Sequence, residues 1–312
     1  MSINLIAGVD CGATKVMVQS GIICSDSGKI LPGLINKEYY YSDCQSWDDN
    51  FLPVSLDIQM SEYLSDNITL TPQEVDQGNS MINTIIESFT NINNHNIGLC
   101  FPGLKNPDGI TVMANGPRIP DLKKRLKRID KILNDSDCCV MGEWKSSIGK
   151  MQDVDNCVYI GGGTGIADGI ILNGTLINLN DTRGVFKSWE LKINSKETVE
   201  SYLSPAGMIR KYNGKNKSKV GSLVELSNKS TFNEIIDHAV DAFSLLIKNR
   251  EKYFEINKQK IQRIVIGQRL GQFLKISHPR YKEKFQICTD IPIKISSDRR
   301  TAALGAGMLA AC

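Results

Sequence analysis

The chain has 312 residues, of which 41% are hydrophobic and 23% charged, the balance of an ordinary soluble globular protein. Its net charge of +3 gives no indication of binding to nucleic acid or to a membrane surface. No apolar run reaches the roughly 18 residues of a membrane span, and the first residues lack the pattern of an export signal. The nine cysteines include no CxxC pair. Together with the missing export-signal pattern, they predict reduced thiols and a cytoplasmic protein.

The first half of the chain alternates predicted strands and helices. Residues 5–10 read as a buried strand, and a second strand follows over residues 14–23 after a short turn. The mixed polar and aromatic stretch 24–75 predicts strand and loops. The spacing of Met81, Ile85 and Phe89 indicates a helix over residues 75–91. Further expected elements are strands at 97–101 and 110–114 and a basic helix at 121–127.

The second half continues this alternation and repeats one feature of the first. Helices are predicted at 138–150, 198–212, 231–253 and 302–311, and strands at 157–160, 169–172, 263–266 and 291–295. Near residue 10 and again near residue 163 the chain runs strand, Gly/Thr-rich turn, strand. This long-period echo predicts an internally duplicated fold of two α/β lobes.

The two turns carry a phosphate-binding signal. Glycine leaves backbone N–H groups uncovered, and a threonine hydroxyl and a lysine ammonium add a donor and a charge. The segment Asp10 to Lys15 contains all of these parts, and Gly162 to Gly165 repeat the glycines and the threonine. Neither turn belongs to a P-loop, because no GxxxxGK[ST] occurs, and residues 170–174 read as strand and hairpin where a Rossmann motif needs a helix. Either turn alone would be interpreted as a tight turn, and their pairing favours phosphate binding.

The ordered motifs resemble those of the ROK family of sugar kinases over nearly the whole chain. Gly8-Val9-Asp10-Cys11-Gly12-Ala13-Thr14-Lys15 is similar to the first phosphate motif, GxDxGGTK, and residues 134–143 resemble the catalytic segment, NDxNxxxxGE. Gly163-Thr164-Gly165 resembles the second phosphate motif. Val265-Ile266-Gly267 resembles the strand and glycine that approach adenosine, and residues 302–306 resemble the closing helix.

The resemblance implies the actin-like ATPase (ribonuclease H-like) fold, in two α/β lobes with ATP in the interlobe cleft. It places one lobe at residues 1–117, joined by the C-terminal helix at 299–312, and the other at 118–298. It implies an ATP-dependent sugar kinase and a homodimer without a nucleic-acid partner. Asp10 would hold Mg²⁺ through water, and the expected ATP contacts are Gly12, Thr14, Lys15, Gly163, Thr164, Gly165 and Gly267.

Asp135 is the candidate general base. Phosphoryl transfer to a hydroxyl needs a carboxylate that accepts the hydroxyl proton and aligns the oxygen. An Asn-Asp pair before a helix is also a common turn or cap, and the flanking motifs favour catalysis for Asp135, whereas Asp137 reads as a cap. The resemblance assigns Asn115 and Asn134 to the sugar, although Asn115 also reads as a turn residue before Gly-Pro.

The chain departs from the ROK pattern after the second turn. The family's GExGH and CxCGxxGC motifs are missing, because residues 178–200 contain neither histidine nor cysteine, so no structural zinc is expected. Glu200 takes the place of a glutamate that opens the next helix and is assigned to the substrate, with a surface charge as the alternative. Asp168 would repel a triphosphate unless it points away or helps to hold a metal. Arg269 would flank the nucleotide or lie at the surface.

Two further interpretations remain open. A non-catalytic sugar or nucleotide sensor of the same fold would account for the altered sugar-facing region, whereas the retained Asp10, Thr14, Asp135 and Thr164 favour an enzyme. An acyl-CoA dehydratase activator-type ATPase is weakened by the absence of a paired-cysteine cluster site.

Overall fold

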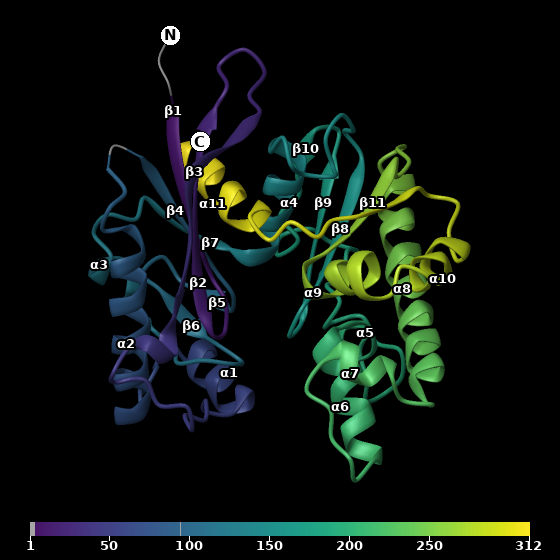
Figure 1. The fold of residues 1–312 in the computed structure, drawn as a ribbon, viewed down its shortest axis with the longest axis horizontal. Coiled ribbons are helices and arrows are strands. Elements are labelled where there is room, and N and C mark those ends of the chain that lie inside the picture. The colour runs from purple at the N-terminus through teal and green to yellow at the C-terminus, as the bar shows by residue number, and fades with distance from the viewer. Residues whose placement is uncertain (1–3, 94) are drawn as a thin grey trace. The chain divides into compact units, whose positions relative to one another are not determined.

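The computed structural model describes residues 4–93 and 95–312, which divide into two compact units (Figure 1). Unit 1 comprises Met1–Ile148 and Arg300–Cys312, and unit 2 comprises Gly149–Arg299. The boundary therefore follows Ile148, whereas the sequence analysis placed it after residue 117. The physical reason is that residues 131–134 extend the sheet of unit 1 as a strand. Within the described residues, no helix is long and apolar enough to cross a bilayer.

Unit 1 is built on a five-stranded mixed sheet. The strands are β1 (Asn4–Cys11), β2 (Lys15–Ile23), β3 (Ile30–Tyr40), β4 (Asn96–Phe101) and β7 (Lys131–Asn134), in the order β3-β2-β1-β4-β7. The first three strands pair antiparallel, and β1, β4 and β7 run parallel. The carboxyl ends of the three parallel strands therefore meet at one edge, which is where ligands bind in open α/β sheets.

Helices cover both faces of this sheet, with α2 (Pro72–Phe89) on one side and α11 (Thr301–Ala311) on the other (Figure 1). A capping box between Thr71 and Glu74 starts α2, and its apolar side, including Met81 and Ile85, packs on the sheet to form the main core. The remaining elements of unit 1 are a 3₁₀ turn (Tyr41–Asp43), α1 (Leu56–Leu64), β5 (Leu104–Lys105), β6 (Ile110–Val112), α3 (Leu122–Arg125) and α4 (Asp135–Lys145).

The C-terminal helix α11 approaches the backbone of its neighbours closely. A Cβ atom on Gly8 of β1 would lie 1.5 Å from the carbonyl oxygen of Ala303, and one on Gly305 would lie 1.9 Å from that of Cys138 on α4. Alanine and glycine on α11 therefore allow a separation that larger side chains would prevent. This contact fixes α4, whose first residue is Asp135, against the sheet.

Unit 2 repeats the sheet of unit 1. Its strands are β8 (Cys157–Gly162), β9 (Ile166–Leu172), β10 (Thr175–Leu176), β11 (Arg263–Gly267) and β12 (Ile293–Ile295), in the order β10-β9-β8-β11-β12. The β8–β9 and β9–β10 pairs are antiparallel, and β8, β11 and β12 run parallel. Because order and strand directions match those of unit 1, the predicted internal duplication is confirmed.

The core of unit 2 lies between this sheet and the 25-residue helix α8 (Phe232–Ile256). The helix predicted at 198–212 is in fact two helices, α5 (Val199–Leu203) and α6 (Pro205–Lys215). Pro205 has no N–H to continue α5, and Ser204 caps the new helix by accepting from the Gly207 N–H. The other elements are α7 (Leu223–Ser227), α9 (Gln268–Gln272), a π-helical turn (Phe273–Ser277) and α10 (Tyr281–Ile287).

Candidate functional site

The first Gly/Thr turn joins β1 to β2 at the carboxyl edge of the unit 1 sheet. The Gly12 N–H donates to the Lys15 carbonyl at 2.9 Å, which closes the turn, and the Thr14 side chain at its tip is exposed. A Cβ on Gly12 would meet nothing closer than 3.4 Å, so the backbone there is open to a ligand. Lys15 instead forms an ion pair with Glu38 on β3, so its charge is already partly neutralised.

The same edge brings acidic residues from β1 and α4 together. Asp10 pairs in register with Cys100 on β4, and Phe101 pairs with Asn134 at the end of β7, immediately before Asp135. Burial raises the pKa of the Cys138 thiol, and the negative charges of Asp137, Asp10 and Asp135 raise it further. The fold therefore brings the carboxylate of Asp10 near those of Asp135 and Asp137, although Asp10 lies more than 120 residues earlier in the sequence.

Asp135 is the first residue of α4, and it does not cap this helix. The N-cap residue is Asn134, and its side chain makes no capping hydrogen bond. The Asp135 carboxylate accepts from the adjacent Ser136 N–H at 2.9 Å and remains half-buried. Asn134 donates through Nδ2 to the Ser136 hydroxyl at 2.6 Å, so both candidate residues are held locally at the edge.

Lys105 joins this group, although it is not among the site residues predicted from the sequence. Its ammonium donates to the Gly103 carbonyl at 2.8 Å and to Asn134 Oδ1 at 3.2 Å. Burial lowers the pKa of Lys105, and the nearby charge of Asp135 opposes this shift. Only a single lysine after Pro102-Gly103 marks the position in the sequence, and no local motif distinguishes it from a surface lysine.

Asn115 lies on the exposed turn that follows β6. The buried Gln59 of α1 fixes the chain just before it, accepting from the Met113 N–H at 2.7 Å and donating to the Met113 carbonyl at 3.1 Å. The mixed polar and aromatic pattern of residues 24–75 predicts strand and loops where α1 lies, so it gives no sign of Gln59. The turn is thus held by a two-way hydrogen bond while the Asn115 side chain remains accessible.

The second turn, in unit 2, joins β8 to β9. The Gly163 N–H donates to the Gly165 carbonyl at 2.8 Å, and residues 163–165 are partly exposed. The Glu200 carboxylate accepts from the Ile166 N–H at 2.8 Å, and a Cβ on Gly165 would lie 2.6 Å from Glu200 Oε2. Glu200 therefore supports the turn directly from α5.

The residues of the first turn fit a magnesium-bound phosphate. Among residues 4–93 and 95–312, no three His, Cys, Asp or Glu side chains cluster in a way that could hold a metal ion. Protein-bound Mg²⁺ commonly takes one or two carboxylates and completes its shell with water and substrate phosphates. One half-buried carboxylate, Asp10, beside the open backbone of Gly12 matches that donor set.

Comparisons of the sequence with known protein families and with curated proteins find no match. Solved structures do match. The chain is similar to a ROK hexokinase from Thermus thermophilus, with 13% identity, a TM-score of 0.60 and coverage of 97% of each chain. It is also similar to an inorganic polyphosphate/ATP-glucomannokinase from Arthrobacter sp. strain KM, with 14% identity, a TM-score of 0.58 and coverage of 99% of this chain and 98% of that one.

A third match is a ROK family transcriptional regulator, a homologue of the E. coli MLC protein. The identity is 15% and the TM-score 0.53, over 98% of this chain and 77% of that one. The chain has the fold of the ROK sugar kinases. The predicted actin-like fold is thereby confirmed, since the duplicated sheets and these alignments agree.

In this ROK fold, hydrogen bonds from a buried ion pair and from its neighbour Asn249 reach the segment 178–200. Asp168 on β9 forms an ion pair with Arg250 on α8, and both side chains are buried. Asp168 also accepts from the Ser188 N–H at 3.4 Å, and Asn249 accepts from the Phe186 N–H at 3.3 Å. The Asp168 carboxylate is therefore paired with Arg250 in the interior of unit 2. Because this charge is paired, we do not expect Asp168 to repel a triphosphate.

The end of β11 in this ROK fold is shaped by packing. A Cβ on Gly267 would lie 2.4 Å from the Tyr159 hydroxyl, so the glycine is required by the neighbouring strand whatever else it contacts. Gln268 follows with a φ of 56°, a left-handed conformation that is uncommon outside glycine. Arg269 is exposed, as its surface interpretation requires.

Proposed function

We propose that this protein is an ATP-dependent kinase of the ROK family that phosphorylates a hydroxyl of a hexose or a related sugar. The observation that carries the proposal is the position of Asp135. It opens α4 at the carboxyl edge of β1, β4 and β7, beside Asn134 and near Asp10. A base, an amide and a metal-binding carboxylate at one edge are the protein groups that phosphoryl transfer to a hydroxyl needs.

In this proposal, Asp135 accepts the proton of the acceptor hydroxyl and aligns its oxygen for transfer. Asn134 and Asn115 hydrogen-bond other hydroxyls of the sugar, because an amide offers both a donor and an acceptor. ATP with Mg²⁺ supplies the phosphoryl group, and Asp10 would hold the metal through water. The Thr14 hydroxyl donates to a phosphate oxygen beside the open backbone of Gly12, whose own N–H closes the turn. Lys15 adds a charge that Glu38 reduces.

The residues of unit 2 have assigned roles in the same proposal. Thr164 and Gly165 donate to phosphate oxygens, Gly163 closes the turn that presents them, and Gly267 lies next to the adenosine. Glu200, which the sequence analysis assigned to the sugar, acts first on the second turn, because its carboxylate already accepts from the Ile166 N–H. A cytoplasmic homodimer without a nucleic-acid partner remains part of the proposal.

The alternative is a sensor that binds the sugar or nucleotide without turnover. Two observations favour it: a transcriptional regulator shares the fold, and the glutamate expected to contact the sugar supports a turn. A sensor has no need of a general base, so it predicts that Asp135 can be replaced without loss of its response.

The test measures ADP release from ATP·Mg²⁺ over a panel of hexoses, N-acetylhexosamines, amino sugars and cyclitols, for wild type and Asp135→Asn. We expect sugar-dependent turnover that Asp135→Asn reduces by roughly 10³-fold, since the variant keeps the side-chain shape and removes the base. The matched control is Asp130→Asn, an exposed aspartate of the same unit. Nucleotide or sugar binding without turnover on any acceptor would favour the sensor.

A further inference from the structure

Lys105 is held in place by the chain around it. It ends β5, and Asn106 fixes the following turn by accepting from the N–H groups of Asp108 at 3.0 Å and Gly109 at 2.8 Å. Gly103, two residues earlier, has a φ of +90°, and a Cβ there would lie 2.3 Å from the Val112 carbonyl. A glycine before Lys105 and a side-chain-stabilised turn after it therefore fix the backbone position of this lysine.

The ammonium of Lys105 determines how Asn134 presents its amide. Asn134 Oδ1 accepts from Lys105 Nζ, so the carbonyl end of the amide faces the cation. Nδ2 then faces the Ser136 hydroxyl and keeps one further proton for a ligand. If the amide were reversed, its NH₂ group would face an ammonium, which also only donates. Lys105 and Ser136 thus leave Asn134 with one defined orientation.

The charge of Lys105 lies next to acidic groups. Asp135 and Asp137 both act on it electrostatically. Two of its three N–H protons have partners, Gly103 O and Asn134 Oδ1, and the third has none within residues 4–93 and 95–312. A half-buried ammonium with one unused donor beside the candidate base is suited to bind an oxygen of a ligand.

We propose that Lys105 is an acceptor-positioning residue: it orients the Asn134 amide and donates its third hydrogen bond to an oxygen of the sugar next to the reacting hydroxyl. This inference rests on the proposed kinase function for its ligand, and it adds a residue that the motifs do not include. The acceptor is then a sugar with two neighbouring oxygens, one directed at Asp135 and one at Lys105.

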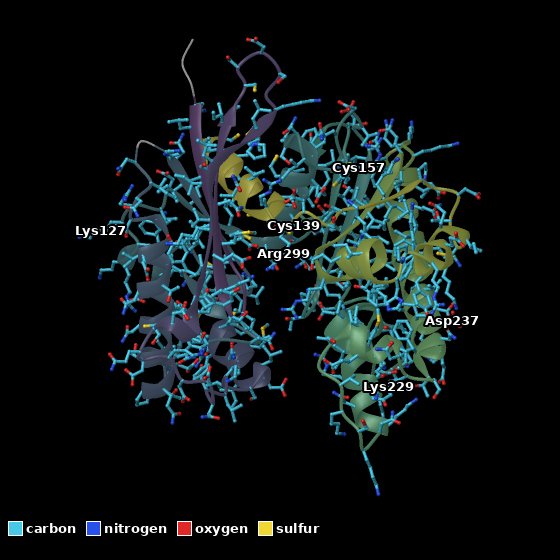
Figure 2. The ribbon with its side chains drawn as sticks, in the orientation of Figure 1. Lys127, Cys139, Cys157, Lys229, Asp237 and Arg299 are labelled. Atoms are coloured by element: carbon cyan, nitrogen blue, oxygen red, sulfur yellow. The ribbon has the colours of Figure 1, made fainter. Side chains whose placement is uncertain are left out.

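The experiment compares Lys105→Met, which keeps the length of the side chain and removes its donors, with Lys105→Arg, which keeps the charge. Lys127→Met is the matched control, since Lys127 lies exposed at the surface of unit 1 (Figure 2). We expect Lys105→Met to raise the acceptor KM by roughly 10- to 100-fold, the effect of losing a charged hydrogen bond, with the ATP KM changed less than about twofold. Lys105→Arg, which keeps the charge, should show a smaller rise in the acceptor KM than Lys105→Met. Thermal unfolding shows whether each variant is folded. If Lys105→Met is misfolded, Lys105→Gln takes its place.

An unchanged acceptor KM, or an equal rise in both KM values, would overturn the inference. If wild type phosphorylates no sugar, the proposed function fails, and a second measurement decides about Lys105. In ¹⁵N-labelled protein without ligand, the side-chain NH₂ signal of Asn134, assigned through Asn134→Asp, should move in Lys105→Met and stay in place in Lys127→Met. A signal that stays in place in both variants would show that Lys105 does not orient Asn134.

Discussion

Arg250 donates to Asp168 across the interior of unit 2, with both side chains buried, one on α8 and the other on β9. A buried charge that loses its partner is strongly destabilised, because the remaining ion has neither water nor an opposite charge. The same pair contacts the segment 178–200, in which no zinc motif is present. Its ion pair and hydrogen bonds therefore anchor that segment through Ser188 and Asn249.

Removing one member of this pair should destabilise unit 2. We expect Asp168→Ala to lower the free energy of unfolding by about 3–5 kcal/mol, measured by urea unfolding and by hydrogen exchange of the β9 and α8 amides. The control is Asp237→Ala, which removes an exposed ion pair with Lys284 at the surface of α8 (Figure 2) and should cost under about 1 kcal/mol. The double variant Asp168→Leu/Arg250→Met should lose less than Asp168→Ala, and equal losses in Asp168→Ala and the control would contradict the assignment.

Close backbone contact around α11 predicts a second effect on stability. A Cβ on Gly142 of α4 would lie 1.7 Å from the Thr301 carbonyl, and one on Gly305 would lie 1.9 Å from that of Cys138. We expect Gly142→Ala and Gly305→Ala each to cost at least about 3 kcal/mol in thermal or urea unfolding, because helix backbones must separate. Gly214→Ala is the control of opposite sign: it lies in α6 with nothing within 4 Å, and alanine there should stabilise by up to about 1 kcal/mol. A tolerated alanine at Gly305 would mean that α11 does not approach α4 this closely.

Glu200 offers a test between two roles. If its carboxylate supports the second turn through the Ile166 N–H, Glu200→Ala should raise the ATP KM roughly 5- to 10-fold and leave the acceptor KM within about twofold. Steady-state kinetics with each substrate varied in turn separates these parameters. Glu225→Ala, at the start of α7 in the same unit, serves as the control. A rise in the acceptor KM alone would return Glu200 to the sugar contact that the motif pattern predicts.

Glu197 predicts a dependence of stability on pH. Hydrogen bonds from Lys211, Tyr202 and Asn194 lower its pKa from 4.5 to about 2. The carboxylate therefore stabilises the fold above its ordinary pKa, and this contribution is lost as the pH falls from about 4.5 to about 2. Because the side chain is about one-third exposed, we expect the increment to be no more than about 1 kcal/mol. Glu197→Gln should be less stable than wild type at pH 7 in urea unfolding, with the difference shrinking at pH 3, and a constant difference would contradict the assignment.

Local sequence patterns predicted most elements of both units. The strand–turn–strand echo near residues 10 and 163 correctly indicated a duplicated fold, because alternating β-branched residues and glycine-rich turns act within a few residues. The helix around Met81 and Ile85 was correct for the same reason, since its apolar spacing is local. Helix α1 was missed, because Leu56, Ile58 and Leu64 remain exposed and give its sequence no clear apolar face.

The boundary between the units could not be read from the chain. Residues 118–148 follow a Gly-Pro turn that resembles a domain end, yet β7 adds to the sheet beside β4 and α4 packs under α11. Those partners lie about 30 and more than 150 residues away in the sequence, so no local pattern encodes the contact. Tertiary packing decided which unit these residues join.

The sequence by itself determined the two turns, the duplicated alternation of strands and helices, and the candidacy of Asp135, because each depends on neighbouring residues. Only the tertiary structure decided the partners of the charged side chains. Lys15 pairs with Glu38, Asp168 with Arg250, and Lys105 with Asn134, over separations of 23, 82 and 29 residues. The physical reason is that strand register and helix packing bring distant side chains within hydrogen-bond distance, and a charge selects its partner by that distance and by burial.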